Sequence, residues 1–290
     1  MRVSFPDSGV WHQRAKRAEF LSEKHSHASS LLLFYLQLIR TQLAVFTETK
    51  QAGLLTEKVV PLSLKADVFR DCLDQQLVQC SQQRFVEFVR TLQVSSTDVL
   101  ADVAKCLVAN PEAANRALRN CAQGIPNDKI GLELGCDCGP VEFFPRAFIQ
   151  PIAEAIVQEG NVQPVGERTA LGVCPYCESA PFASVLRDEP DLKGKRTLQC
   201  SLCASEWVFP RSCCPRCGEE TPEQLDYHIS EAWPHVRIEE CRSCRTYLKA
   251  IDLRTNGLAV PVVDELASVE LDLWASEQGM AKLQQNVLGL

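Results

Sequence analysis

Apolar residues recur at three- and four-residue steps through most of the first 160 positions, which is the period of an amphipathic helix. The clearest stretch runs from Ser29 to Phe46 without proline or glycine. Val68 to Val94 and Phe144 to Glu159 repeat the pattern, and Pro151 predicts a kink or a division in the last stretch. Asn110-Pro111 predicts a helix start, because asparagine caps helices and proline suits the first helical position. The pattern predicts about six helices packed as a bundle.

The period changes after residue 160. The stretch from Gly160 to Gly166 is rich in turn-forming residues and predicts a domain boundary. Beyond it, short runs with β-forming residues alternate with turns, which predicts strands. These runs are Phe182–Leu186, Arg196–Cys200, Glu206–Phe209, Asp226–Ile229, Val236–Glu240 and Thr246–Leu253. Residues 263–283 return to a helical pattern, with one apolar face formed by Leu266, Val269, Leu273 and Trp274.

Composition and charge exclude several classes of function. The 290 residues carry a net charge of -7, and residues 171–250 hold 10 Lys/Arg against 12 Asp/Glu. A nucleic-acid binder needs a basic surface, so no nucleic-acid partner is expected. The chain has no run of 18 uncharged apolar residues, and its first 20 residues lack the apolar core of a signal peptide, so neither membrane insertion nor export is expected. Fifteen cysteines in an unexported chain fit a reducing compartment, which predicts a cytoplasmic protein.

Four Cys-x-x-Cys pairs lie within residues 174–244, and their spacing repeats. The gap between the first and second pairs holds 22 residues and the gap between the third and fourth holds 23, so the second half follows the first at an offset of 40 and then 41. Four thiolates make one tetrahedral metal site, so eight make two. The eight predicted ligands are Cys174, Cys177, Cys200, Cys203, Cys214, Cys217, Cys241 and Cys244.

The repeat favours sequential pairing of the turns. It assigns the first two pairs to one site and the last two to a second, although an interleaved cross-brace would use the same residues. Cys213 is an alternative ligand that fits the spacing less well than Cys214. Ribbons of about 30 residues are too small to build a sufficient core, and a structural metal contributes on the order of 10 kcal/mol to folding. Because zinc and iron both suit a Cys₄ site, the expected cofactors are two metal ions, iron or zinc.

The turns carry further local signals. Pro175 and Pro215 occupy the same slot in the first and third pairs, and each limits the freedom of the unfolded turn. Gly218 follows Cys217 at a position where a left-handed residue is often needed. Trp207 and Tyr247 follow the second and fourth pairs, and we expect both to pack over the metal turns.

The chain is therefore predicted to be an α+β multidomain protein. An all-α helical N-terminal domain (residues 1–165) precedes two tandem β modules of the rubredoxin-like or zinc-ribbon type (166–210 and 211–255). A C-terminal helical tail (256–290) completes the predicted organisation.

The remaining cysteines and histidines carry weaker signals. Cys136 and Cys138 flank an aspartate between two glycines, which suits either two ordinary thiols or a reactive pair. His228 lies in the long loop of the second ribbon, where packing is its expected role. Small apolar positions in helices are the expected role of four more cysteines, namely Cys72, Cys80, Cys106 and Cys121.

No familiar catalytic motif is present, whether a dinucleotide fingerprint, a P-loop, a nucleophile elbow or paired carboxylates. We therefore expect a protein that is not an enzyme, with neither catalytic residues nor cofactor-binding residues apart from the metal ligands. Two alternatives use the ribbons by themselves, as an Fe(Cys)₄ electron carrier or as a nucleic-acid-binding zinc ribbon. The large helical domain counts against the first, and the charge balance counts against the second.

Four motifs follow one another in a specific order: C-P-Y-C, L-Q-C-S-L-C-A-S-E-W, R-S-C-C-P-R-C-G and E-E-C-R-S-C-R-T-Y-L-K. In this order they resemble the formate dehydrogenase accessory proteins, over about residues 140–275, while the helical part fits that family only loosely. The family commonly has glycine after the first and fourth pairs, where this chain has Glu178 and Arg245. A non-glycine residue at a left-handed position costs roughly 1 kcal/mol.

The resemblance implies a cytoplasmic accessory protein needed for the assembly or activation of a molybdenum- or tungsten-containing formate dehydrogenase. It implies that the protein binds the catalytic subunit of that enzyme through its metal-ribbon domain. It also implies rubredoxin-like centres that bind iron, with the eight cysteines as ligands. The sequence leaves the oligomeric state open.

Overall fold

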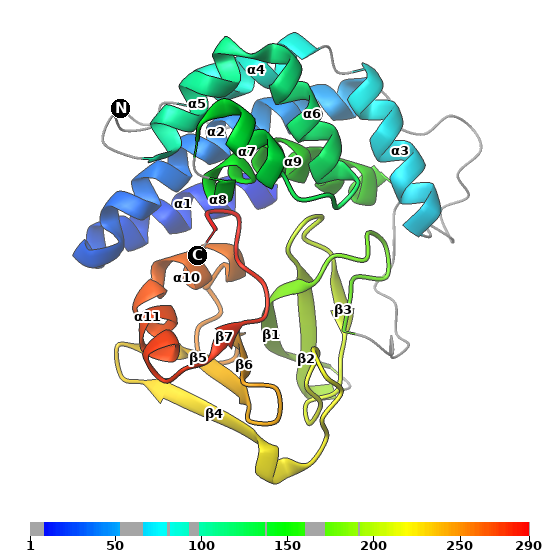
Figure 1. Ribbon diagram of the computed structural model, residues 1–290. Coiled ribbons are helices and arrows are strands. Elements are labelled where there is room, and N and C mark those ends of the chain that lie inside the picture. Colours follow the sequence, from blue (N-terminus) through cyan, green and yellow to red (C-terminus); the bar gives the residue numbers. More distant parts are fainter. Residues whose placement is uncertain are drawn as a thin grey trace. The chain divides into compact units, whose positions relative to one another are not determined.

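The computed structural model describes residues 9–52, 66–79, 82–92, 99–136, 138–159, 172–190 and 192–289 (Figure 1). The chain forms two compact units. The first contains residues 1–36 together with 163–286 and 290, and the second contains residues 37–162 together with 287–289. The predicted boundary at 160–166 lies outside the described residues, so the four predicted domains remain a prediction.

The second unit is helical within its described residues. It holds the C-terminal part of α2 (Ser29–Gln51) and seven further helices: α3 (Ala66–Gln79), α4 (Gln82–Thr91), α5 (Val99–Ala109), α6 (Pro111–Ala122), α7 (Asp128–Leu134), α8 (Cys138–Val141) and α9 (Phe143–Glu159). Helix α9 is buried along most of its length. Phe85 and Phe88 of α4 each meet the ring of Phe148 edge-on, with ring centroids 5.3 Å apart. These aromatic contacts join α4 to α9 in the core of the unit.

The prediction of a helical region is confirmed, but the described residues before position 160 hold nine α-helices and not about six, and three local features differ. The expected helix over 68–94 is wrong as a single element, because α3 ends at Gln79 and α4 begins at Gln82. Pro151 lies inside a continuous α9 and does not divide it. Pro111 opens α6 as expected, but the side chain of Asn110 forms no cap and donates to the carbonyl oxygen of Cys106 at 2.9 Å.

Residues 26–51, which include α2, are long and apolar enough to cross a lipid bilayer by length and composition alone. Half of the apolar window is buried inside the protein, as in the core helix of a globular domain. The absence of membrane insertion therefore stays a prediction.

The first unit is built on one sheet. Its strands are β1 (Pro181–Glu189), β2 (Leu192–Cys200), β3 (Glu206–Val208), β4 (Leu225–Ser230), β5 (Trp233–Cys241), β6 (Thr246–Asp252) and β7 (Ala281–Lys282). All six strands expected from the sequence are present. Their order is β3-β2-β1-β6-β5-β4, and β7 pairs with the beginning of β6 (Figure 1).

The sheet preserves the sequence repeat. Strands β1, β2 and β3 form one antiparallel group and β4, β5 and β6 form another in the same order, so the two halves lie side by side in a head-to-tail arrangement. They join through a parallel pair, β1 and β6, in which Ala183 lies opposite Lys249 and Leu186 opposite Asp252. The two predicted ribbons are therefore continuous through one sheet.

Helices at both ends of the chain complete the first unit. Helix α1 (Gly9–Lys24) is followed by a short 3₁₀ turn, η1 (Ser26–Ala28), and the tail forms α10 (Pro261–Ala267) and α11 (Val269–Glu277). The Arg17 guanidinium reaches the carboxylate of Asp264 at 2.5 and 3.0 Å, and His235 on β5 contacts the same carboxylate at 2.7 Å. This shared carboxylate ties α1 and β5 to α10.

The tail differs from the expected single helix. It divides into α10 and α11 and then ends in a short strand, β7, that runs parallel to β6. Leu266 is buried as expected, whereas Leu273 is exposed. The predicted α+β class is confirmed, with a helical N-terminal region, a sheet that carries the cysteine pairs and C-terminal helices.

Candidate metal centres

The four Cys-x-x-Cys turns share one backbone conformation. In the turns that begin at Cys174, Cys200 and Cys214, the N–H of the first cysteine donates at 2.9 Å to the carbonyl oxygen of the residue five positions later. In the fourth turn, Cys241 at the end of β5 lies opposite Thr246 at the start of β6, which is the same separation. Each pair of sulfurs is thus presented on a tight turn between extended segments.

The residue after each second cysteine adopts the left-handed conformation. The φ angles are 60° at Glu178, 55° at Ala204, 76° at Gly218 and 54° at Arg245. The expectation for Gly218, Glu178 and Arg245 is confirmed. Ala204 also adopts the left-handed conformation, which the sequence pattern of the turns did not predict. Three of the four turns therefore carry the cost of a non-glycine residue in this region, roughly 1 kcal/mol each.

The first two turns bring four sulfurs together. The Sγ atoms of Cys174 and Cys203 lie 3.6 Å apart, those of Cys177 and Cys200 3.3 Å, and those of Cys177 and Cys203 3.6 Å. A disulfide would require about 2.05 Å. A metal with bonds of about 2.3 Å to sulfur in a tetrahedron requires sulfurs about 3.8 Å apart. The spacing fits a shared cation and not a disulfide.

The last two turns form a second group of the same kind. The Sγ atoms of Cys214 and Cys244 lie 3.8 Å apart, and those of Cys217 and Cys241 lie 3.7 Å apart. Within each group all four sulfurs lie within 4.8 Å of one another. The eight cysteines are partitioned sequentially, as the repeat favoured, and not as a cross-brace. Their role as metal ligands stays a prediction.

Local hydrogen bonds stabilise the first group. The N–H groups of Leu202 and Cys203 donate to the sulfur of Cys200 at 3.3 and 3.5 Å. The Ser205 hydroxyl lies 2.9 Å from the sulfur of Cys203. N–H groups that point at sulfur stabilise the thiolate form, which is the form that binds a metal.

The protonation of the clustered thiols depends on burial and on their neighbours. Burial raises the pKa of Cys200 and Cys203, whereas hydrogen bonds from Cys174 and the other thiols lower the pKa of Cys177. In the second group, burial raises the pKa of Cys214. Four buried thiols cannot all ionise by themselves, and a central cation removes this obstacle because metal binding displaces their protons.

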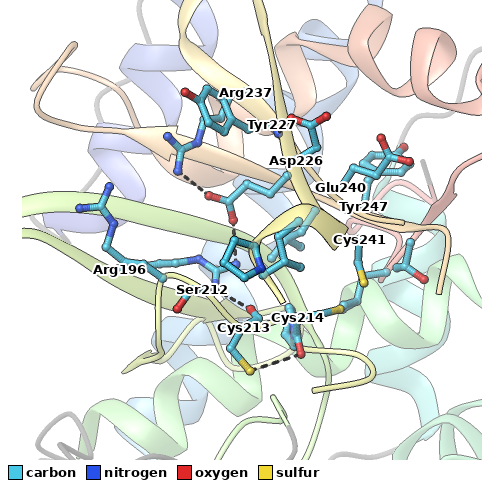
Figure 2. Close-up of a pocket in the computed structure, with 18 residues that line it drawn as sticks. Arg196, Ser212, Cys213, Cys214, Asp226, Tyr227, Arg237, Glu240, Cys241 and Tyr247 are labelled. Carbon is cyan, nitrogen blue, oxygen red and sulfur yellow. Dashed lines mark hydrogen bonds and ion pairs between the residues drawn. The ribbon is translucent and has the colours of Figure 1, made fainter. Parts of the chain in front are cut away.

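A cavity of about 240 Å³ lies against the second group. Figure 2 shows Cys213, Cys214 and Cys241 lining it together with Arg196, Arg237 and Tyr227. The carboxylate of Glu239 lies between the two guanidinium groups, 2.7 Å from each. Burial alone would raise the pKa of Glu239, but Arg196 and Arg237 outweigh burial and hold its pKa below the usual range.

A network of buried charged side chains lies next to the fourth turn. The ammonium group of Lys249 on β6 is fully buried, 2.6 Å from Asp272 and 3.1 Å from Glu265. Lys282 on β7 contacts the same two carboxylates at 2.5 and 3.0 Å, and the Tyr247 hydroxyl donates to Asp272 at 2.8 Å. The network fixes β6, α11 and β7 to one another next to the fourth turn.

The sequence pattern does not predict this network. Lysine, glutamate and aspartate are normally assigned to the surface, and their pairing spans 33 residues of chain from Lys249 to Lys282. The one available signal was the motif Tyr247-Leu248-Lys249, which carries part of the family resemblance.

The other residues named from sequence have ordinary surroundings. Cys213 is buried outside both groups, and its thiol lies 3.8 Å from the carbonyl oxygen of Cys214. His228 contacts Glu240 at 2.9 Å and tilts over the ring of Trp274. Trp207 is fully buried.

The helical cysteines also behave as expected. Burial raises the pKa of Cys72 and raises that of Cys121 to about 12, which keeps both thiols protonated. Cys136 is half-buried and donates to the carbonyl oxygen of Leu134. Cys80 and the side chain of Cys138 lie outside the described residues.

Comparisons with known proteins agree with this arrangement. Residues 173–211 match the family model "FdhE, central domain", and residues 213–288 match "FdhE, C-terminal domain". The division between the two falls between β3 and the third turn, so each matched segment contains one group of four sulfurs.

Two curated relatives share the name "Protein FdhE homolog". The one from Aquifex aeolicus is 40% identical over 158 residues, 54% of this chain, and the match spans about half (55%) of that relative's length. The one from Haemophilus influenzae (strain PittGG) is 26% identical over 280 residues, 94% of this chain and 86% of the relative.

The fold also matches a solved structure, "The crystal structure of the FdhE protein from Pseudomonas aeruginosa". The match has a TM-score of 0.68 at 22% identity and covers 98% of this chain and 97% of that one. At this identity the match establishes the common fold. With two FdhE domain models matched within residues 173–288 and a curated FdhE homolog aligned over 94% of the chain, the resemblance to the FdhE family of formate dehydrogenase accessory proteins is confirmed.

Proposed function

We propose that this protein assists the assembly or activation of a molybdenum- or tungsten-containing formate dehydrogenase by binding its catalytic subunit through the metal-bearing sheet. The observation that carries the proposal is the pair of Cys₄ groups, each within one matched FdhE domain. The protein would act in the cytoplasm, where reduced thiols persist.

Each group is proposed to hold one metal ion, iron or zinc. The donor set fits, because the sulfurs of each group lie within 4.8 Å of one another and their hydrogen-bonded pairs, at 3.3–3.8 Å, are near the edge length of a tetrahedral site. The proposed ligands are the eight cysteines named above. In these sites the metal would close the turns, and the surrounding residues would orient them.

We further propose that the protein acts on the enzyme and does not itself convert formate. The charged groups around the second site are held in ion pairs, with Glu239 between two arginines and Glu240 between His228 and Arg245. Groups held in this way serve the packing of the sheet and are not poised for proton transfer.

The test is capture of the catalytic subunit. Tagged full-length protein, metallated anaerobically, should retain a formate dehydrogenase catalytic subunit co-expressed in the same host, and formate dehydrogenase activity should depend on its presence. A variant in which Cys174 and Cys214 are both replaced by serine should lose both properties. If no complex forms with both partners folded and metallated, the proposal fails.

An electron-carrier role is the second candidate, and the exposure of Cys217 at the second site favours it. An iron-loaded Fe(Cys)₄ protein would show thiolate-to-iron charge-transfer absorption that bleaches on reduction. Stoichiometric zinc without iron uptake would remove this candidate.

A further inference from the structure

The two Cys₄ groups differ in their exposure to solvent. In the first group Cys177 is the most exposed residue, and it is half-buried. In the second group Cys217 is exposed and Cys244 is half-buried. An incoming ligand can therefore reach the second group directly.

The turn that carries Cys217 is anchored on one side and open on the other. Its Pro215 lies against Gly172, so closely that a Cβ atom on the glycine would fall 2.2 Å from the proline carbonyl oxygen. At Gly218, by contrast, a Cβ atom would meet nothing within 4 Å. The Cys214 end of the turn is therefore closely packed, whereas the position that follows Cys217 faces open space.

Space also lies behind the second group. The cavity of about 240 Å³ reaches Cys214 and Cys241, which are seen at its lower and right sides in Figure 2. Interiors are normally close-packed, so a cavity beside a metal turn allows the remaining sulfurs to adjust when one ligand changes. The cavity lining contains no cysteine of the first group.

Positive charge distinguishes the two groups at the level of sequence. The turns of the second group contain Arg216 and Arg242, and Arg245 follows directly. The turns of the first group contain no basic residue, and Glu178 follows the first of them. Arg242 and Arg245 pair with Asp226 and Glu240, so among the described residues of these turns Arg216 is the guanidinium that can attract an anionic ligand from solution.

We propose that the second group is an exchange site, at which a small anionic thiol takes the place of Cys217 on the metal, while the first group retains its metal. This inference rests on the proposed metal binding. In the exchange one metal–sulfur bond to Cys217 breaks and one to the incoming thiolate forms. The incoming thiolate and the released Cys217 thiolate carry equal charge, so no electron is transferred and the coordination number is kept.

The experiment follows zinc release from the full-length protein loaded with two equivalents. A chromogenic zinc chelator is added with glutathione as the anionic thiol or 2-mercaptoethanol as the neutral one. Release should occur in two phases of one equivalent each, with rates about tenfold or more apart. Glutathione should accelerate only the fast phase. In Cys217→Ser the zinc ion that is released in the fast phase should no longer be bound, while the slow phase of release should remain.

A charge variant keeps the test valid if the cysteine variant misfolds. Arg216→Glu should reduce the acceleration by glutathione severalfold and leave release by 2-mercaptoethanol unchanged. The matched control is Lys193→Glu, an exposed position on β2 about 23 Å along the strand from Cys200, which should change neither rate.

Release of both equivalents at one rate, or retention of the fast phase in Cys217→Ser, would overturn the inference. An equal effect of Arg216→Glu on both thiols would also overturn it. The total zinc released on denaturation is read separately. Fewer than two equivalents at that end point contradicts the proposed metal binding itself.

Discussion

Replacing Lys249 by methionine tests whether the buried charge network holds the metal-bearing sheet together. Methionine keeps much of the length of the side chain and removes only the ammonium group. That group is fully buried, contacts Asp272 at 2.6 Å and Glu265 at 3.1 Å, and also donates to the backbone carbonyl oxygen of Glu265. The variant therefore leaves two buried carboxylates with one cation fewer.

The expected loss in the free energy of unfolding depends on the charged groups that remain in the variant. Removing one partner of a buried ion pair costs about 3–5 kcal/mol, because the other charge stays buried. Lys282 still contacts both carboxylates in the variant, at 2.5 Å from Glu265 and 3.0 Å from Asp272. The lower end of the range applies, so we expect Lys249→Met to reduce the free energy of unfolding by about 3 kcal/mol.

Tryptophan fluorescence during urea unfolding measures this loss of stability in the first unit, which contains the network. All four tryptophans, Trp11, Trp207, Trp233 and Trp274, belong to the first unit. With zinc held at a fixed saturating level, a loss of 3 kcal/mol should shift the urea midpoint by about 1–2 M.

A double-mutant cycle identifies the cause. Lys249→Met combined with Glu265→Gln should cost less than the sum of the single changes by at least about 1 kcal/mol, because the second change removes a carboxylate that the first left unpaired. Lys195→Met is the control. It removes a partly exposed partner of Glu189 on β1 and should cost less than about 1 kcal/mol. A loss below about 1 kcal/mol for Lys249→Met, or strict additivity in the cycle, would refute the reasoning.

Three further predictions follow from the same unit. The pKa of Glu239 lies below its usual range in the folded state. The ionised carboxylate therefore stabilises the fold above about pH 4.3, and this contribution is lost as the pH falls further. On acidification the urea midpoint of Glu239→Gln should decline less than that of the native chain. Ala204 has a φ of 55°, so Ala204→Gly should raise the free energy of unfolding by about 0.5 kcal/mol and Ala204→Val should lower it by at least about 1 kcal/mol in the same urea assay. Cys200→Ser and Cys241→Ser should each lose one of two bound metals in an anaerobic metal analysis, and survival of both metals in either variant would contradict the assignment of the ligands.

Local spacing explains why so much of the site was predictable. A Cys-x-x-Cys turn is a self-contained unit, and its conformation depends on neighbours within five residues, as the repeated hydrogen bond from Cys174, Cys200 and Cys214 shows. The repeat at an offset of 40 then selects which turns share a group. The strands were predictable for a similar reason, since five of the six predicted strands, all but β4, begin or end beside one of these turns.

Pairings between distant parts of the chain were not predictable. Nothing local to β1 or β6 specifies that they pair in parallel, because parallel pairing depends on the crossover and on side chains from both halves. The polar appearance of α1 conceals Arg17, whose partner Asp264 lies 247 residues away. The division between α3 and α4 was missed because the apolar period continues across it.

The order of the strands links the sheet to the proposed exchange. Strands β1 and β6 both start at a cysteine turn and run parallel, while β2 and β5 both end at one, so the first, second and fourth turns lie at the same end of the sheet. The sulfurs of the third turn lie within 4.8 Å of those of the fourth, which places the third turn there as well. If the second metal leaves, β6 is still paired with β1, β5 and β7, and its Lys249 remains bound to α11. The third and fourth turns both supply proposed ligands to that metal, but the fourth is also held by the pairing of β5 with β6, whereas the third precedes β4, an edge strand paired with β5 alone. Exchange at the second group therefore requires a local rearrangement of the third turn and the β4 edge, and the rest of the sheet can stay folded while it occurs.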